Sequence, residues 1–108
     1  MADFTLSDMQ RMQQALQDKY AHRWEPITPA IGQNKLLWMV GEIGEVIDII
    51  KKNGAQAAVT DPALRSDLVE ELADVLMFYN DVLLCYGITS EELQQAYVQK
   101  FERNMTRW

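Results

Sequence analysis

The sequence contains one cysteine and one histidine in 108 residues. A single cysteine, Cys85, excludes a disulfide within the chain, and a zinc site usually recruits Cys or His ligands. No uncharged apolar run is long enough to cross a bilayer, so no membrane association is expected. The start of the chain, Met1 to Asp3, lacks the basic and apolar stretches of a signal peptide. The expected location is therefore cytoplasmic.

Positive charge is also scarce. Ten Lys and Arg residues stand against 16 Asp and Glu residues, which gives a net charge of -6. Binding to a nucleic-acid polymer needs a basic surface, so that class of partner is excluded. Hydrophobic residues make up 48% and charged residues 24%, which is a globular composition. The length fits a single domain over residues 1–108.

Alternation of apolar and polar residues, the pattern of a half-buried strand, is absent, and helical signals replace it. The first helix is expected to begin near Thr5 or Ser7, where Ser7 and Gln10 have capping-box spacing. Thr-Pro, Asp-Pro and Thr-x-x-Glu sequences are typical starts of three further helices. The four predicted helices run from Thr5 or Ser7 to Tyr20, Thr28 to Lys52, Asp61 to about Gly87, and Thr89 to Arg107 or Trp108. The chain is predicted to be all-α, with helical hairpins.

The second predicted helix has two faces that carry apolar residues. One is continuous and is the expected core face: Leu36, Met39, Val40, Ile43, Val46, Ile47 and Ile50. Glu42 and Glu45 lie on roughly the opposite side, beside Trp38 and Ile49. A merely solvated face rarely carries Trp and Ile next to its acids. We therefore expect a partner on each side of this helix, with another subunit as one candidate.

The third predicted helix carries a stripe of acids beside its apolar face, and this stripe comprises Asp67, Glu71, Asp74 and Asp81, with Phe78 among them. That face comprises Leu64, Leu68, Leu72, Val75, Leu76, Tyr79, Val82, Leu83 and Tyr86. Asp67, Glu71 and Asp74 are spaced at i, i+4 and i+7, and such like-charge pairs destabilise a helix by roughly 0.2–0.5 kcal/mol each. Carboxylates beside a core are costly unless a cation neutralises them. An oxygen-only set suits Mg²⁺, with Mn²⁺ as the second choice, and a di-iron bundle would need Glu-x-x-His motifs that this sequence lacks.

The last predicted helix gathers the positive charge of the chain. Lys100, Arg103 and Arg107 share a stripe with Asn104. Basic residues near a helix C-terminus often only complement the helix dipole. In the same way, one E-x-x-E pair alone is usually structural, and tryptophans are as often packing residues as base-stacking ones. Two acid pairs on neighbouring helices are much less common.

The two acid pairs carry a resemblance to a known family. Glu42-Ile43-Gly44-Glu45 and Glu71-Leu72-Ala73-Asp74 resemble the E-x-x-E … E-x-x-D signature of MazG-like nucleoside triphosphate pyrophosphohydrolases. This all-α superfamily also includes dimeric dUTPases, dCTP pyrophosphatases and phosphoribosyl-ATP pyrophosphohydrolases. The resemblance extends from about Tyr20 to Trp108, although Gly41 stands where many members have Glu. It implies a four-helix bundle completed by oligomerisation, as a homodimer or homotetramer.

The resemblance also implies roles for individual residues. Four carboxylates would be the metal ligands and catalytic residues: Glu42, Glu45, Glu71 and Asp74. The phosphates would face Lys100, Arg103 and Asn104, and the base pocket would contain Trp24, Trp38 and Phe78. The implied reaction is Mg²⁺-dependent hydrolysis of ribo- or deoxyribonucleoside triphosphates to monophosphate and pyrophosphate, with removal of non-canonical nucleotides as one role.

Two alternatives remain open at the level of the sequence. The first is a related enzyme specialised for dUTP, dCTP or phosphoribosyl-ATP, because the signature does not encode base selection. The second is a non-catalytic helical module of the same fold that pairs with another protein through its second apolar face. The intact set of four carboxylates argues against this module.

Overall fold

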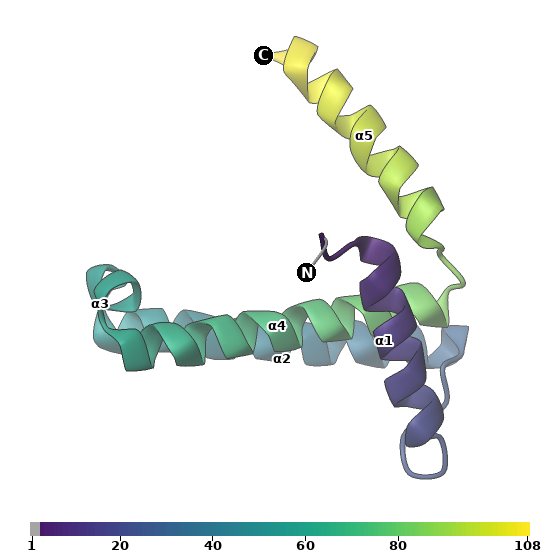
Figure 1. Cartoon of the computed structure of the whole chain (residues 1–108), viewed down its shortest axis with the longest axis horizontal. Helices are drawn as coiled ribbons and strands as arrows, with labels where there is room; N and C mark the ends of the chain where they lie inside the picture. The colour runs from purple at the N-terminus through teal and green to yellow at the C-terminus, as the bar shows by residue number, and fades with distance from the viewer. Residues whose placement is uncertain (1–2) are drawn as a thin grey trace.

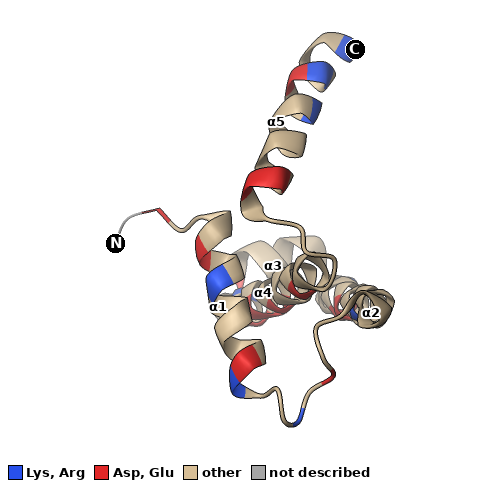
Figure 2. Cartoon of the chain, turned by 90° about the vertical axis from the view of Figure 1, so that its right-hand side faces the viewer, with Lys and Arg blue, Asp and Glu red and all other residues tan. Residues whose placement is uncertain are grey.

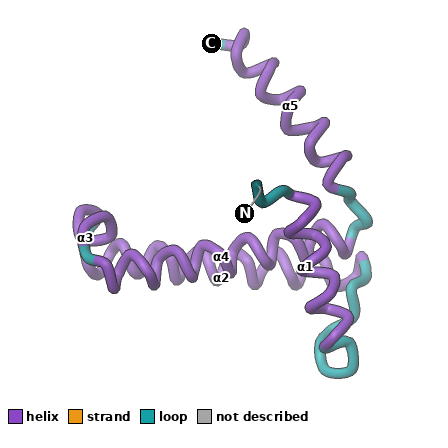
Figure 3. Tube along the Cα trace, in the orientation of Figure 1, coloured by secondary structure: helices purple, strands orange, loops and turns teal. Residues whose placement is uncertain are grey.

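The computed structural model describes residues 3–108, so Met1 and Ala2 of the N-terminal segment considered above lie outside it. It contains five helices, α1 Leu6–Lys19, α2 Pro29–Asn53, α3 Ala55–Thr60, α4 Pro62–Cys85 and α5 Ser90–Arg107 (Figure 1). Only helices and loops are present over this range (Figure 3). The all-α class is therefore confirmed.

The first helix begins at a capping box that differs from the expected one. The Thr5 hydroxyl accepts a hydrogen bond from the Asp8 backbone N–H, and the Asp8 carboxylate accepts one from the Thr5 N–H. The Ser7–Gln10 box was therefore wrong, although a start near Thr5 was correct. Asp8 serves better than Gln10 because its short carboxylate lies at the third helical position after the cap.

The turn between the two long helices contains a short helix that was not predicted. Gly54 ends α2 with a φ of +90°, a conformation that favours glycine. Six residues then form α3, too few to show a helical period in the sequence. Asp61 follows and caps α4, because its side chain accepts hydrogen bonds from the N–H groups of Ala63 and Leu64.

The two long helices form an antiparallel hairpin that the other helices surround unevenly. α2 and α4 pack along their length, α3 closes one end, and α1 crosses α4 near the other end (Figure 1). At that open end Gly32 of α2 lies beneath the ring of Tyr86, where an added Cβ would come within 2.5 Å of the ring. The exposed Tyr86 side chain therefore lies directly against the backbone of Gly32 and would have to move to admit a side chain there.

The last helix projects away from the hairpin (Figure 2). α4 and α5 are bent by 111° relative to each other, and Gly87 in their junction has a φ of +65°. Within residues 3–108, α5 packs only against α1. No single helix of the described chain is long and apolar enough to cross a membrane; α4 and α5 reach that composition only as a bent pair.

The expected core face of α2 is largely exposed, which corrects the sequence prediction. Val40 and Ile47 are 61% and 56% exposed, and Leu36, Ile43 and Ile50 are exposed as well. The residues of α2 that are more covered are spaced by three and four positions and include Lys35, Met39, Glu42, Val46 and Ile49. The sequence prediction assumed that a single chain buries the whole apolar face of α2, and a single chain covers only part of it.

The apolar face of α4 is also partly covered and partly exposed. Leu83 is buried and most of the face is partly covered, but Leu72 and Leu76 are 49% and 42% exposed. Tyr86 is also exposed. The hairpin of one chain therefore leaves apolar surface on both long helices uncovered.

Candidate metal centre and adjoining cavity

Three of the four predicted carboxylates meet between the long helices. Glu42 and Glu45 are one turn apart on α2, and Glu71 reaches them from α4. One oxygen from each residue lies within 4.8 Å of the other two. Glu42 and Glu71 are partly buried, whereas Glu45 is exposed. We call these three residues the carboxylate group.

The carboxylate group contains oxygens that lack partners. The Oε2 atoms of Glu42 and Glu71 are buried and accept no hydrogen bond within the described chain, and such orphaned buried acceptors are rare and costly. Burial, reinforced by neighbouring Glu45, raises the pKa of Glu42 to about 7. Burial and Glu45 also raise the pKa of Glu71. A hard divalent cation would satisfy these oxygens and remove the repulsion, so the residues fit a Mg²⁺-type ion.

Without a bound cation, the stability of the protein is expected to fall as the pH rises from about 4.5 to about 7. The ordinary pKa of Glu42 is 4.5 and its folded value is about 7. Between these values the folded state binds more protons than the unfolded chain, so the free energy of unfolding decreases with rising pH. Thermal unfolding in chelator across this range measures the effect.

A divalent cation should reverse this dependence, because it binds the ionised carboxylates. Mg²⁺ or Mn²⁺ is expected to raise the unfolding temperature more at about pH 8 than at about pH 6. The control is Glu42→Gln, which should flatten the chelator curve by removing the group with the raised pKa. A larger stabilisation by metal at the lower pH would contradict a carboxylate site.

The fourth predicted ligand, Asp74, lies beside the carboxylate group but outside it. It follows Glu71 by one turn of α4, and its negative charge contributes to the raised pKa of both Glu42 and Glu71. Asp74 also lines the adjoining cavity. The structure thus brings it to the border between the carboxylates and the cavity.

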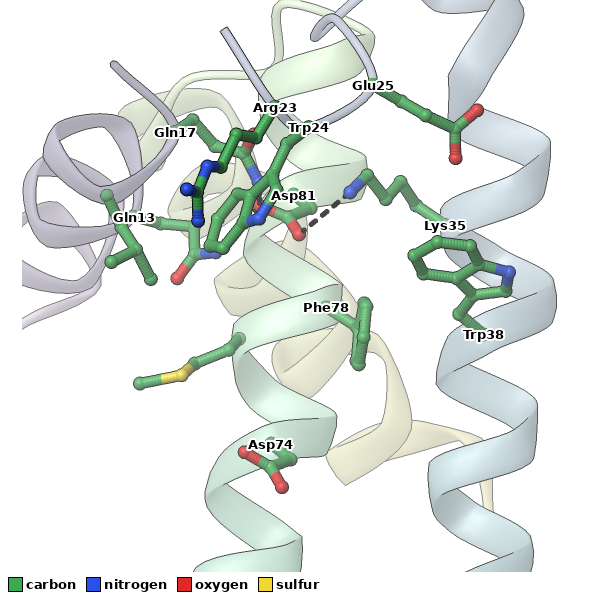
Figure 4. A pocket seen from close by; sticks show the side chains of 12 residues that line it. Gln13, Gln17, Arg23, Trp24, Glu25, Lys35, Trp38, Asp74, Phe78 and Asp81 are labelled. Atoms are coloured by element: carbon green, nitrogen blue, oxygen red, sulfur yellow. Dashed lines mark hydrogen bonds and ion pairs between the residues drawn. The ribbon is translucent and has the colours of Figure 1, made fainter. Parts of the chain in front are cut away.

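A cavity of about 350 Å³ opens next to Asp74 (Figure 4). It lies between α1, α2, α4 and the loop that joins α1 to α2, and its volume is in the range of small-molecule sites. The three aromatic residues predicted for the base pocket, Trp24, Trp38 and Phe78, all line it. Trp38 and Phe78 are packed edge to face, with ring centroids 6.0 Å apart. The structure therefore brings these aromatic residues together.

A buried polar network forms the end of the cavity away from Asp74 (Figure 4). Asp81 Oδ1 accepts hydrogen bonds from Gln13 Nε2 at 2.8 Å and from Gln17 Nε2 at 3.0 Å. Lys35 Nζ lies 3.6 Å from Asp81 Oδ2. All four residues are buried. Sequence reasoning did not identify this Asp81 network, because glutamines on an amphipathic helix are ordinarily exposed.

The predicted phosphate-binding residues lie elsewhere in a single chain. Lys100, Arg103 and Asn104 are exposed on α5, which projects away from the hairpin (Figure 2). Lys100 and Asn104 border a groove on α5 itself, together with Tyr97 and Phe101. One chain therefore does not bring these three residues to the carboxylate group, and their role stays a prediction.

Comparison with known proteins identifies the family of the chain. The family described as MazG nucleotide pyrophosphohydrolase domain matches residues 32–106, which contain all four predicted carboxylates. α1 and the loop after it precede the matched region. Neither a curated protein nor a solved structure matches the chain. Because the match covers well over half of the sequence, the chain belongs to the MazG nucleotide pyrophosphohydrolase family.

Proposed function

We propose that this protein hydrolyses nucleoside triphosphates to nucleoside monophosphate and pyrophosphate with Mg²⁺, or alternatively Mn²⁺. The observation that carries the proposal is the pair of buried, unpartnered oxygens of Glu42 and Glu71 beside a cavity lined with aromatic residues. Membership of a nucleotide pyrophosphohydrolase family supports the reaction class. The carboxylates would hold the cation, and the cavity would hold the nucleoside.

The carboxylates would have two roles in this reaction, metal binding and activation of the attacking water. Glu42, Glu45 and Glu71 would hold the metal, and Asp74 would complete the set from the border of the cavity. When bound, the metal supplies positive charge that neutralises the triphosphate and lowers the pKa of an attacking water. Glu45 is the exposed member of the carboxylate group, so a water can reach it, and it is our first candidate for the general base.

The aromatic residues would bind the rest of the nucleotide. Trp38 and Phe78 stand between Asp74 and the Asp81 network, which is where the nucleoside would lie if the phosphates are at the carboxylates (Figure 4). Stacking of a base on aromatic rings favours every base and so gives affinity without selection. Trp24 closes the same cavity from the loop after α1 and stacks on Tyr20, with ring centroids 4.7 Å apart.

We also infer that the active form is a homodimer or homotetramer. The radius of gyration is 16.3 Å, whereas a compact domain of this length is expected to have about 13 Å. Exposed apolar residues continue along both hairpin helices, and include Leu36, Val40, Ile43, Ile47, Ile50, Val69, Leu72 and Leu76. Contiguous apolar surface of this kind usually marks an interface. A second copy would also offer an α5 that could reach the phosphates with Lys100, Arg103 and Asn104.

Product analysis tests the reaction class directly. Purified protein incubated with Mg²⁺ and a panel of ribo- and deoxyribonucleoside triphosphates is expected to release monophosphate and pyrophosphate in equal amounts. Chelation of the metal should stop the release, because the carboxylates alone repel the substrate. Phosphoribosyl-ATP belongs in the same panel as the substrate of a related specialised enzyme.

Two outcomes would contradict the proposed function. Release of orthophosphate would show cleavage at a different bond. No turnover of any substrate by folded, metal-loaded protein would favour a non-catalytic interaction module of the same fold.

A further inference from the structure

Lys35 is a buried cation without a hydrogen bond. Its side chain is 5% exposed, and its nearest charge partner, Asp81 Oδ2, lies 3.6 Å away, which is too long for a hydrogen bond. No other described residue accepts a hydrogen bond from its ammonium, although the group lies near the ring of Trp38. Because the Lys35 ammonium borders the cavity, its N–H donors are available to a ligand bound there. The group lines the cavity and points across it toward Asp81 (Figure 4).

The hydrogen bonds beside Lys35 determine which neighbouring atoms donate and which accept. An ionised carboxylate can only accept, so Gln13 and Gln17 must turn their NH₂ groups toward Asp81 Oδ1. Their amide oxygens are then left as acceptors, and Asp81 Oδ2 keeps free lone pairs beside Lys35. This end of the cavity thus presents an acceptor, Asp81 Oδ2, and a donor, Lys35 Nζ, side by side.

The distance from Asp74 to the Asp81 network suits a nucleotide whose phosphates lie near Asp74. Asp74, Phe78 and Asp81 follow one another on α4 at intervals of four and three residues and all line the cavity. Seven residues of α-helix span about 10 Å. This span is comparable with the length of a nucleotide from its α-phosphate to the outer edge of its base. Phosphates at the Asp74 end would therefore place the base edge at Asp81 and Lys35.

We propose that Asp81 and Lys35 select bases that carry an exocyclic amino group beside an unprotonated ring nitrogen, as cytosine and adenine do. This inference rests on the proposed nucleotide hydrolysis. The amino group would donate to Asp81 Oδ2, and Lys35 would donate to the ring nitrogen. In uracil both groups are reversed, so a carbonyl oxygen would face the carboxylate and an N–H would face the ammonium. Gln13 and Gln17 are positioning residues that hold Asp81, and both precede the matched family region.

The sharpest comparison is dCTP against dUTP, which differ in this edge alone. The wild-type protein is expected to prefer dCTP in kcat/KM by roughly 10- to 100-fold, the range for hydrogen bonds to charged groups. Asp81→Asn should reduce the ratio toward one, because a carboxamide can turn a donor toward the uracil carbonyl. The matched control is Asp18→Asn, because Asp18 also accepts a glutamine amide, from Gln14, yet is exposed and lies outside the cavity.

Binding measurements separate this inference from the proposed reaction. Calorimetry with Mg²⁺ and the α,β-imido analogues of dCTP and dUTP reports base preference without turnover. A preference for the dCTP analogue in a protein without hydrolysis would support the inference while overturning the reaction. Equal binding and equal hydrolysis of the two nucleotides would overturn the inference alone, and binding of neither analogue would overturn both. The preference of the wild-type protein for dCTP over dUTP tests the inference even if the Asp81→Asn variant does not fold.

Discussion

Replacement of Glu71 by glutamine is expected to lower kcat by at least about 100-fold, the scale for losing one group that stabilises a transition state electrostatically. Glutamine keeps the shape of the side chain but cannot supply the anionic oxygen, and the Glu71 Oε2 atom is one of the two buried oxygens without a partner. The same change removes repulsion among carboxylates whose pKa values are raised by burial. The metal-free variant should therefore unfold at the same temperature as the wild type or at a higher one near neutral pH.

The combination of lost activity and undiminished stability is what identifies a functional carboxylate. Hydrolysis kinetics at saturating Mg²⁺ and thermal unfolding in chelator measure the two quantities. The neighbouring residue provides a matched control, because Glu70→Gln makes the same substitution at an exposed position of α4 outside the carboxylate group. Near-normal turnover in Glu71→Gln would remove this residue from the metal site.

The second large effect is expected at the exposed apolar face of α2. Val40→Glu should convert the inferred oligomer into single chains of 12.5 kDa and abolish most of the proposed activity. Val40 is 61% exposed in one chain, so a charge there has little effect on the fold of that chain. Buried between two copies, an unpaired carboxylate would weaken the association by several kcal/mol, or a rise in Kd of at least about 100-fold.

Light scattering during gel filtration measures the mass of both proteins. Val59→Glu is the control, because Val59 of α3 is 60% exposed but lies at the closed end of the hairpin, away from the centre of the apolar face. A wild-type protein that elutes as a monomer would refute the inferred oligomer. An oligomer that survives Val40→Glu would place the interface elsewhere.

The starts of the long helices were predictable from the sequence because capping chemistry is local. Thr28-Pro29 and Asp61-Pro62 lie where α2 and α4 begin, and Thr89 caps α5 as its spacing from Glu92 predicted. The side chain of Thr28 makes no capping hydrogen bond, so proline alone marks that start. The choice of the buried face of α2 was wrong because burial depends on which element packs on the helix, and the sequence of α2 does not contain that information.

The part of the candidate site that depends on local spacing was predictable from the sequence, and the part that depends on long-range contacts was not. The E-x-x-E and E-x-x-D spacings place each acid pair on one helix face, and the hairpin then brings Glu42, Glu45 and Glu71 together. The Asp81 network joins residues that are 64 and 68 positions apart. No local pattern distinguishes Gln13 and Gln17 from other glutamines of α1, because their burial arises only from contact with α4.

The cavity is assembled from two parts of the chain that can diversify independently. Half of its twelve lining residues precede position 32, in α1 and the loop after it, whereas the carboxylate group lies entirely within the matched family region. Mutations that accumulate in the first part during evolution would alter the shape and polarity around a ligand without disturbing the acids proposed to hold a cation. A lineage carrying this architecture can therefore explore new ligands by drift in its N-terminal third while selection preserves the proposed metal centre.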